Sequence, residues 1–278
     1  MSNTSIKSWI ETVKPVALWI LILVIVLQSV WPLFCQFVLY PTGILQSLSR
    51  LTGYIIHQTF MVNIISFLCA GFLLCYIGGL RSKDFALFSK KIFPAVWFTI
   101  FAWAIIQLSP LAFGYELVVN TTWSKEGVLA NELSRFFTGQ IFGNALYEEL
   151  FFRAMLISQL AILFRKKCSN SKSIIFAIIC SQIIFSLMHI PHRIVNGIPV
   201  DQMAGNLTAL FIAGLLFVTL FSLSNNIFVV VGVHALANAS PNIFEHCDNQ
   251  FGIFGIIVIF LLIFTVKWVL RKYSTMRS

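Results

Sequence analysis

The chain alternates long apolar runs with short polar stretches. A membrane-spanning helix needs roughly 20 apolar residues, and eight runs reach or approach that length. The runs fall near residues 16–38, 59–79, 92–113, 139–164, 173–190, 204–224, 226–241 and 251–270. The seventh run is short, and it could instead be a half-buried helix shielded by its neighbours. The pattern predicts an all-α, polytopic transmembrane helix bundle with about eight spans.

The composition supports this interpretation. The 278 residues are 58% hydrophobic and 10% charged, whereas a soluble domain carries about 25% charged residues. The first run, from Pro15 to about Tyr40, is longer than the apolar core of a signal peptide, so we expect a retained helix. The six cysteines are scattered and form no CxxC pair, which argues against a disulfide framework or a zinc ribbon. We expect one membrane-embedded domain over residues 1–278.

The loop charges indicate an orientation. Fourteen Lys and Arg side chains lie in the N-terminal segment, in the loops at 81–91 and 165–172, and in the C-terminal segment. Only four lie in the alternate loops, so the positive-inside rule places both termini in the cytoplasm. The net charge of +9 is accounted for by attraction to anionic headgroups. Membrane lipids are therefore expected partners, and nucleic acid is not.

Residues 114–137 form the longest polar stretch between runs. Val128, Leu129, Leu133 and Phe136 fall on one helical face of its second half, together with Phe137. We predict an amphipathic helix at the outer membrane interface that leads into the fourth run. The alternative is an ordinary surface loop.

Glu148, Glu149 and Arg153 interrupt the fourth run. Each ionisable group at the centre of a bilayer costs roughly 2.5–3.5 kcal/mol, so three together indicate a function. Glu149 and Arg153 are four residues apart, and on a helix they can pair. Glu148 points about 100° away and has no evident helical partner. Burial favours the protonated form of such a carboxyl group and makes it a candidate general base. The alternative is that the three charges only join helices.

Later runs carry further polar side chains. His189 ends the fifth run, and His234 and Asn238 share one face of the seventh. One Glu, two His and an Asn can position a water molecule and stabilise an oxyanion. Two His and one Glu are also a zinc-ligand set with room for water. A GxS serine motif and an HExxH motif are absent, and the only aspartates, Asp84, Asp201 and Asp248, lie outside the runs.

Three motifs occur in order within these runs. They read EELFFR from Glu148 to Arg153, FSLMH from Phe185 to His189, and HALAN from His234 to Asn238. They resemble the EExxxR, FxxxH and HxxxN motifs of the CAAX-processing and bacteriocin-processing protease family, the Abi or type II CAAX prenyl endopeptidase group. The resemblance covers roughly residues 139–241, which we expect to be the catalytic core. Ala154 departs from the Gly that is common in that family.

The resemblance implies an intramembrane endopeptidase that cleaves a peptide bond in a membrane-associated protein or peptide. Glu148 would activate water with help from His189, while His234 and Asn238 would stabilise the oxyanion. Glu149 and Arg153 would hold the site together. The resemblance leaves open a zinc ion on Glu148, His189 and His234 or a metal-free glutamate mechanism. It also implies a bacterial cell membrane, and either CAAX processing or bacteriocin self-immunity.

Two other functions remain open from the sequence. Intramembrane Glu and His could form the relay of a proton-coupled transporter or channel, and the chain could be a non-catalytic immunity protein. For a protease, the loop charges predict a site in the outer half of the membrane, reached from the outer side or laterally from lipid. The sequence does not determine the oligomeric state.

Overall fold

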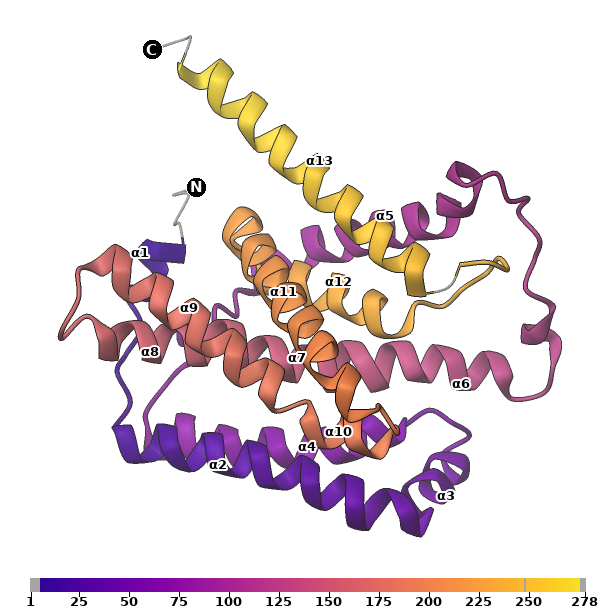
Figure 1. Cartoon of the computed structure of the whole chain (residues 1–278), viewed down its shortest axis with the longest axis horizontal. Helices are drawn as coiled ribbons and strands as arrows, with labels where there is room; N and C mark the ends of the chain where they lie inside the picture. Colours follow the sequence, from indigo (N-terminus) through magenta and orange to yellow (C-terminus); the bar gives the residue numbers. More distant parts are fainter. Residues whose placement is uncertain (1–5, 248, 276–278) are drawn as a thin grey trace.

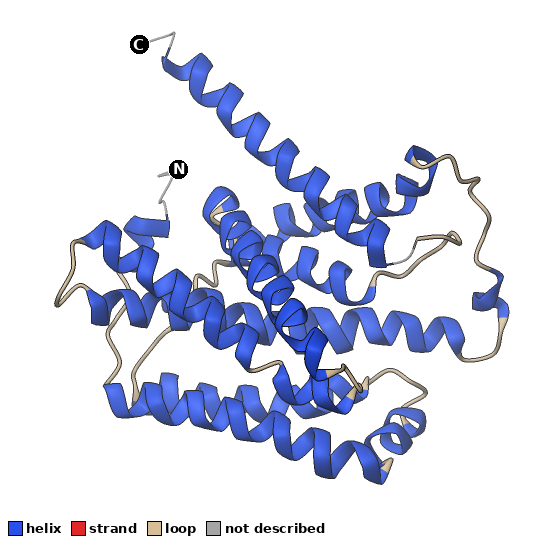
Figure 2. Cartoon of the chain, viewed as in Figure 1, coloured by secondary structure: helices blue, strands red, loops and turns tan. Residues whose placement is uncertain are grey.

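The computed structural model describes residues 6–247 and 249–275. Within them the regular structure is entirely helical, and Figures 1 and 2 show helices joined mostly by short loops. An isolated antiparallel bridge between Val119 and Phe244 joins two of the longer loops. The all-α prediction is confirmed for this part of the chain.

Most helices run for several turns, and short helical turns link them. The α-helices are α1 (Ile6–Ile10), α2 (Leu18–Phe34), α3 (Ile44–Leu51), α4 (Gln58–Gly71), α5 (Ile92–Ala112), α6 (Val128–Ser134), α7 (Ala145–Glu148), α8 (Ile157–Phe164), α9 (Asn170–Leu187), α10 (Ile190–Val195), α11 (Val200–Ser224), α12 (Ile227–Ala239) and α13 (Asn249–Thr275). The π-helical segments are η1 (Cys35–Leu39), η3 (Phe72–Ile77), η7 (Arg135–Asn144) and η8 (Glu149–Leu156). The 3₁₀ turns are η2 (Tyr40–Thr42), η4 (Ser82–Phe85), η5 (Ser89–Lys91) and η6 (Thr121–Ser124).

Five helical stretches in the described residues are long and apolar enough to cross a membrane. They are Leu18–Thr42, Gln58–Ile77, Ser82–Ala112, Asn170–Val195 and Val200–Ser224. They correspond to the first, second, third, fifth and sixth predicted spans. The other three predicted spans also fall on helices, but the total of about eight spans and the side of each terminus stay predictions.

The fourth predicted span is part of a longer helix. Helical structure runs without a break from Val128 to Phe164, so no loop separates the predicted amphipathic segment from the predicted span, and the start of that span near residue 139 stays a prediction. The predicted amphipathic segment is the first part of this helix. Its expected apolar face is split, because Phe136 is buried while Leu129, Leu133 and Phe137 are exposed. Much of the helix is π-helical, with hydrogen bonds from residue i to i+5.

The seventh predicted span is α12, whose 13 residues extend only about 20 Å at 1.5 Å per residue. Ten of its residues are buried. It packs against α5, η7 and α11, and Gly232 lets the Thr99 side chain of α5 come close to its backbone. Its short length and enclosure by neighbouring helices favour the alternative of a helix shielded by its neighbours, although it is more than half buried.

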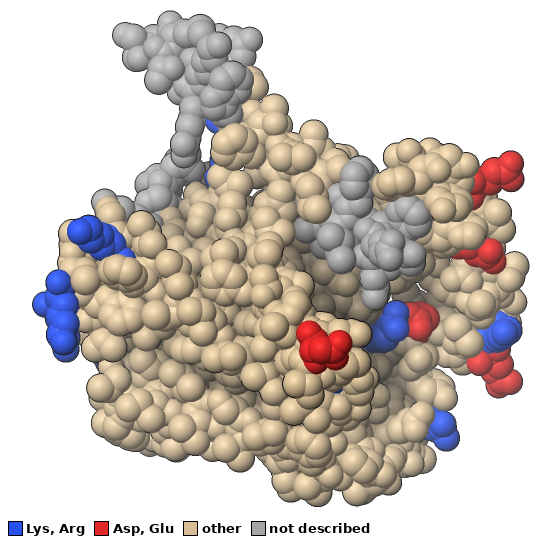
Figure 3. Space-filling model, in the orientation of Figure 1, with Lys and Arg blue, Asp and Glu red and all other residues tan. Residues whose placement is uncertain are grey.

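The surface of the bundle is apolar. The face seen in Figure 3 carries few charged side chains over a broad uncharged area. Large apolar side chains are exposed on most of the long helices, including Trp97 of α5, Ile175 of α9 and Phe264 of α13. Such a surface suits contact with lipid rather than water. All eight residues of η8 are buried, so the segment with Glu149 and Arg153 runs through the interior.

Candidate active site

Glu149 and Arg153 form a fully buried ion pair. Their side chains are both 0% exposed, and Arg153 Nε lies 3.3 Å from Glu149 Oε2. The predicted pairing four residues apart therefore persists, although the backbone here is π-helical rather than α-helical. Removing both charges from water is unfavourable, so a pair at this depth needs further compensating contacts.

His234 supplies one of these contacts. Its Nδ1 lies 2.6 Å from Glu149 Oε1, so the carboxylate stands between a guanidinium and an imidazole. The other ring nitrogen, Nε2, lies 3.6 Å from Glu148 Oε2. His234 is thus placed between the two adjacent glutamates. The sequence linked Glu149 only to Arg153, and the structure corrects this by adding His234.

His189 approaches Glu148 from the other side. It lies at the junction of α9 and α10, and its Nε2 is 3.9 Å from Glu148 Oε1. Its Nδ1 is 2.7 Å from the carbonyl oxygen of Phe185, one turn earlier. Glu148 was expected to lack a partner on its own helix. Its neighbours come from two other elements, as the three motifs indicated.

These contacts determine which ring nitrogens carry hydrogen. A carbonyl oxygen can only accept a hydrogen bond, so His189 Nδ1 is protonated. Glu149 Oε2 is paired with Arg153, and Glu149 Oε1 likewise accepts from His234 Nδ1. The Nε2 atoms of both rings are left for other partners, and both face Glu148. Their distances of 3.6 and 3.9 Å from the Glu148 carboxyl oxygens are too long for direct hydrogen bonds and suit a small bridging molecule such as water.

The charged groups of the site are gathered around His234. Glu148 and Glu149 each bring a carboxyl oxygen near one of its ring nitrogens, and Arg153 is a guanidinium that pairs with Glu149. A protonated His234 would therefore have a carboxyl oxygen near each N–H group.

Aromatic rings enclose the cation and the histidines. The Arg153 guanidinium lies 4.3 Å from the ring centre of Phe185 and 5.4 Å from that of Phe217 on α11. Phe217 also stacks on His234, with ring centres 4.7 Å apart. The Arg153 Nη1 and Nη2 atoms have no hydrogen-bond partner among the described residues. Their charge is stabilised by Glu149 and by these ring faces.

Asn238, the sixth predicted site residue, contacts a residue outside that set. It follows His234 by one turn of α12, as expected, and it is exposed. Its Nδ2 donates to Gln140 Oε1 over 3.0 Å, in η7. Asn238 is therefore held near the site by Gln140, a residue that sequence reasoning did not single out.

The sequence left open a zinc ion on Glu148, His189 and His234. Among the described residues, no group of three or more His, Cys, Asp or Glu side chains has an arrangement that could hold a metal ion. Glu148 lies 3.9 Å from His189 Nε2 and 3.6 Å from His234 Nε2, but the three groups do not form a ready-made coordination site.

Gln140 and Phe217 are the functional candidates that the sequence did not reveal. Gln140 lies two turns before Glu148 on the same helix, which is a usable signal, since a polar residue at that spacing shares its face. Phe217 is one of 28 phenylalanines, and nothing in the sequence distinguishes it.

Comparison with known proteins identifies the segment that holds this site. Residues 130–240 match the family described as type II CAAX prenyl endopeptidase Rce1-like. No curated protein and no solved structure gives a significant match. The matched segment starts near the beginning of the long helix that runs from Val128 to Phe164 and ends just after Asn238, so it contains all three motifs. Residues 130–240 of this chain are thus similar to the Rce1-like type II CAAX prenyl endopeptidase family, in agreement with the resemblance of its three motifs.

Proposed function

We propose that the protein is an intramembrane endopeptidase in which Glu148 activates the attacking water. The observation that supports this best is the position of Glu148. Its carboxylate faces the Nε2 atoms of His189 and His234, and its side chain is 12% exposed, whereas Glu149 and Arg153 are fully enclosed. Glu148 can therefore meet a substrate, and the buried pair cannot.

The proposed reaction begins with a water molecule held by Glu148 and His189. Both offer lone pairs, so both accept the hydrogens of this water and direct its oxygen outward. The oxygen attacks the scissile carbonyl carbon, and Glu148 takes the released proton. The carbonyl oxygen becomes an oxyanion. Glu148 then gives the proton to the amide nitrogen, the C–N bond breaks, and the products are a carboxylic acid and an amine.

His234 and Asn238 are the proposed oxyanion donors. With a proton on each nitrogen, His234 offers Nε2–H while Nδ1–H remains bound to Glu149. Removing one oxyanion donor costs about 2.7–4 kcal/mol of transition-state stabilisation in an acyl-transfer enzyme. Asn238 would donate the second N–H of its amide to the oxyanion, while the first stays bonded to Gln140. Glu149 and Arg153 are positioning residues, because they act on the substrate only through His234.

The proposed substrate is a protein or peptide attached to the membrane. The site lies in an apolar bundle whose outer surface suits lipid, so a substrate that is itself held in the membrane meets it most readily. The family description names prenylated CAAX sequences, and we propose these as the first substrate class to test. Self-immunity against bacteriocins and a bacterial membrane stay proposals that only the family resemblance supports.

The test is cleavage of two peptides by purified full-length protein in nanodiscs. One is a fluorogenic peptide that ends in a farnesylated CAAX sequence, and the other is the same peptide without the lipid. We expect Glu148→Gln to reduce cleavage at least a hundredfold while the thermal unfolding temperature stays within about 2 °C. Glu132→Gln is the matched control, since Glu132 lies on the same long helix but pairs with Arg135 at the surface. Full cleavage by Glu148→Gln would refute the assignment, and proton-linked uptake without cleavage would favour a transporter.

The same preparation decides between the metal-dependent and metal-free mechanisms. We propose the metal-free route, in which Glu148 itself is the base. Metal analysis should then find well under one zinc per chain in active protein, and a strong chelator should leave the rate unchanged. Stoichiometric zinc that is lost in both Glu148→Ala and His234→Ala would establish the metal-dependent alternative.

A further inference from the structure

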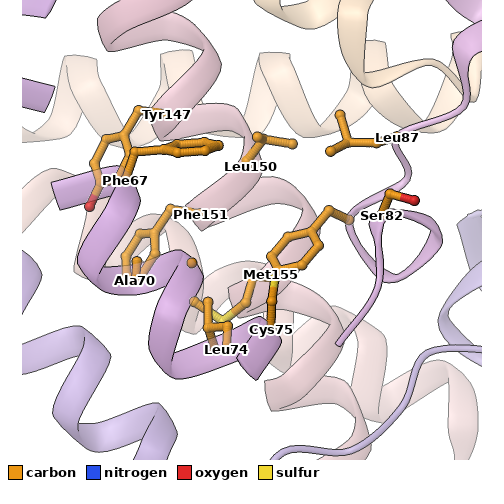
Figure 4. A pocket seen from close by; sticks show the side chains of 12 residues that line it. Phe67, Ala70, Leu74, Cys75, Ser82, Leu87, Tyr147, Leu150, Phe151 and Met155 are labelled. Atoms are coloured by element: carbon orange, nitrogen blue, oxygen red, sulfur yellow. The ribbon is translucent and has the colours of Figure 1, made fainter. Parts of the chain in front are cut away.

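An apolar cavity lies beside the helical segment that carries Glu148 and Glu149. Its volume is about 240 Å³, and its wall combines residues of α4 and η3, the loop 82–87, and the segment Tyr147–Met155. Figure 4 shows these side chains around the space, with Tyr147, Phe67, Phe151 and Ala70 on the left and Leu87 and Ser82 on the right. None of Glu148, Glu149, Arg153, His189 and His234 lines it. The proposed reaction therefore makes no use of this cavity.

The chemistry of the wall selects an apolar occupant. Nearly all the lining side chains are aliphatic or aromatic, and the polar exceptions are Ser82, the Cys75 thiol and the Tyr147 phenol. An apolar cavity of about 150 Å³ elsewhere stays dry and binds benzene, so a larger one suits a hydrocarbon chain. The space is also not sealed from its surroundings. A long chain could enter it from the membrane while the rest of the molecule stays outside.

Cations surround the part of the wall formed by Ser82. Arg81 and Lys83 flank that residue and are exposed. Lys14 is also exposed, with its Nζ 3.5 Å from the carbonyl oxygen of Gly79. The nearby carboxylate, Asp84, is buried and accepts hydrogen bonds from the backbone N–H groups of Arg81 and Lys14. The local charge outside the cavity is therefore positive, which favours an anionic headgroup.

We propose that this cavity binds one acyl chain of an anionic phospholipid, whose headgroup lies against Lys14, Arg81 and Lys83. A lipid fits better than the peptide substrate, because Glu148, the proposed base for the attacking water, does not line the cavity. Tyr147, Leu150 and Phe151 come from the same turns as Glu148 and Glu149. A bound chain therefore packs directly against the helix that carries the proposed catalytic groups.

Photo-crosslinking tests the proposal in the unaltered protein. Full-length protein is placed in nanodiscs that contain phosphatidylglycerol with a diazirine near the end of one acyl chain. Peptide mass spectrometry should locate most crosslinks on wall residues such as Cys75, Phe151 and Met155. The same probe on phosphatidylcholine should label them several-fold less. Crosslinks confined to outward-facing residues such as Phe93 and Leu261, with none in the wall, would overturn the site.

Filling the cavity provides the second test. A Cβ added at Gly71 would meet no atom within 4 Å, and Gly71 lines the cavity, so Gly71→Phe places a ring in the space. Gly205 on α11 is equally open and lies outside the wall, which makes Gly205→Phe the matched control. Native mass spectrometry after detergent extraction should show at least fivefold less retained phosphatidylglycerol for Gly71→Phe and no change for Gly205→Phe.

A double substitution tests how the basic side chains select the lipid headgroup. The double substitution Arg81→Gln with Lys83→Gln should remove the preference for phosphatidylglycerol over phosphatidylcholine while a chain is still retained.

Equal lipid retention by wild type, Gly71→Phe and Gly205→Phe would rule out the cavity as the binding site. If Gly71→Phe does not fold, as shown by thermal unfolding, the crosslinking result alone decides. Crosslinking of the wall by a prenylated peptide but by neither phospholipid would assign the cavity to substrate instead.

Discussion

His234 Nδ1 lies 2.6 Å from Glu149 Oε1, and this contact joins two segments that are 85 residues apart. The other oxygen of Glu149 pairs with Arg153 at 3.3 Å, so one carboxylate stabilises a guanidinium and orients an imidazole. Because Nδ1 is occupied in this way, Nε2 of His234 must face Glu148. Glu149 therefore has a positional role that its pairing with Arg153 alone does not suggest.

Replacing Glu149 by Gln should affect both stability and activity. The change keeps the size of the side chain but leaves Arg153 as a buried cation without a carboxylate, and breaking a buried pair in this way costs about 3–5 kcal/mol. His234 also loses the acceptor that holds its ring. We expect a clearly lower unfolding temperature and a large loss of peptide cleavage, measured on the same detergent-purified sample.

The double variant Glu149→Gln with Arg153→Met separates these two effects. It removes both charges, so the unfolding temperature should recover most of the loss seen in Glu149→Gln. Cleavage should stay low, because His234 still lacks its carboxylate. Recovery of both quantities would show that Glu149 serves only to neutralise Arg153, and our account of His234 would then be wrong.

The sequence was most informative about helices and least informative about contacts between them. Apolar runs located the helices, because burial in lipid demands length and hydrophobicity, and both can be read along the chain. The two glutamates, two histidines and Arg153 were found because charge in an apolar run is costly. The contact of His234 with Glu149 rather than Glu148 alone depends on how α12 packs against η8. The π-helical turns also change side-chain directions in a way that a 3.6-residue period does not describe.

Phe217 should contribute to both the stability of the protein and the rate of cleavage. It stacks on His234 and lies 5.4 Å from the Arg153 guanidinium, so Phe217→Leu removes a ring face from both. Desolvated cation–π contacts are worth about 2 kcal/mol, and we expect a lower unfolding temperature together with at least tenfold slower cleavage. Phe264→Leu on α13 is the control, since that ring is exposed and should be replaceable without effect on either quantity. Indistinguishable behaviour of the two variants would contradict this role.

Gln140 should control the rate rather than substrate affinity. It accepts a hydrogen bond from Asn238 at 3.0 Å and thereby fixes the direction of that amide. A hydrogen bond of this type contributes about 0.5–1.5 kcal/mol, so Gln140→Leu should lower kcat roughly 2- to 12-fold and leave KM nearly unchanged. Gln140→Glu keeps an acceptor oxygen and should retain more of the rate. A change in KM alone would indicate that Gln140 contacts the substrate directly and does not act through Asn238.

His57 caps the start of α4 at a distance from the proposed reaction. Its Nδ1 accepts a hydrogen bond from the Thr59 backbone N–H at 3.2 Å, which requires a lone pair on that nitrogen. The ring packs closely on Gly139 of η7, because a Cβ at that position would lie 2.9 Å from Nδ1. Burial and the nearby Arg135 guanidinium both lower the pKa of His57 below its usual 6.5. The folded protein therefore favours the neutral ring, which can act as the cap.

This lowered pKa predicts a loss of stability on acidification. Since the unfolded chain takes up its proton near pH 6.5 and the folded chain does so only at lower pH, stability is fully present above pH 6.5 and falls as the pH drops toward the folded pKa. His57→Asn keeps a capping acceptor but cannot be protonated, so it should lose less stability than wild type between pH 7.5 and 5. The measurement is the unfolding temperature of both proteins across that range, with amide exchange at Thr59 and Phe60 as a local readout. Parallel curves for the two proteins would mean that the pKa of His57 is the same in the folded and unfolded states, and the lowered pKa would then be wrong.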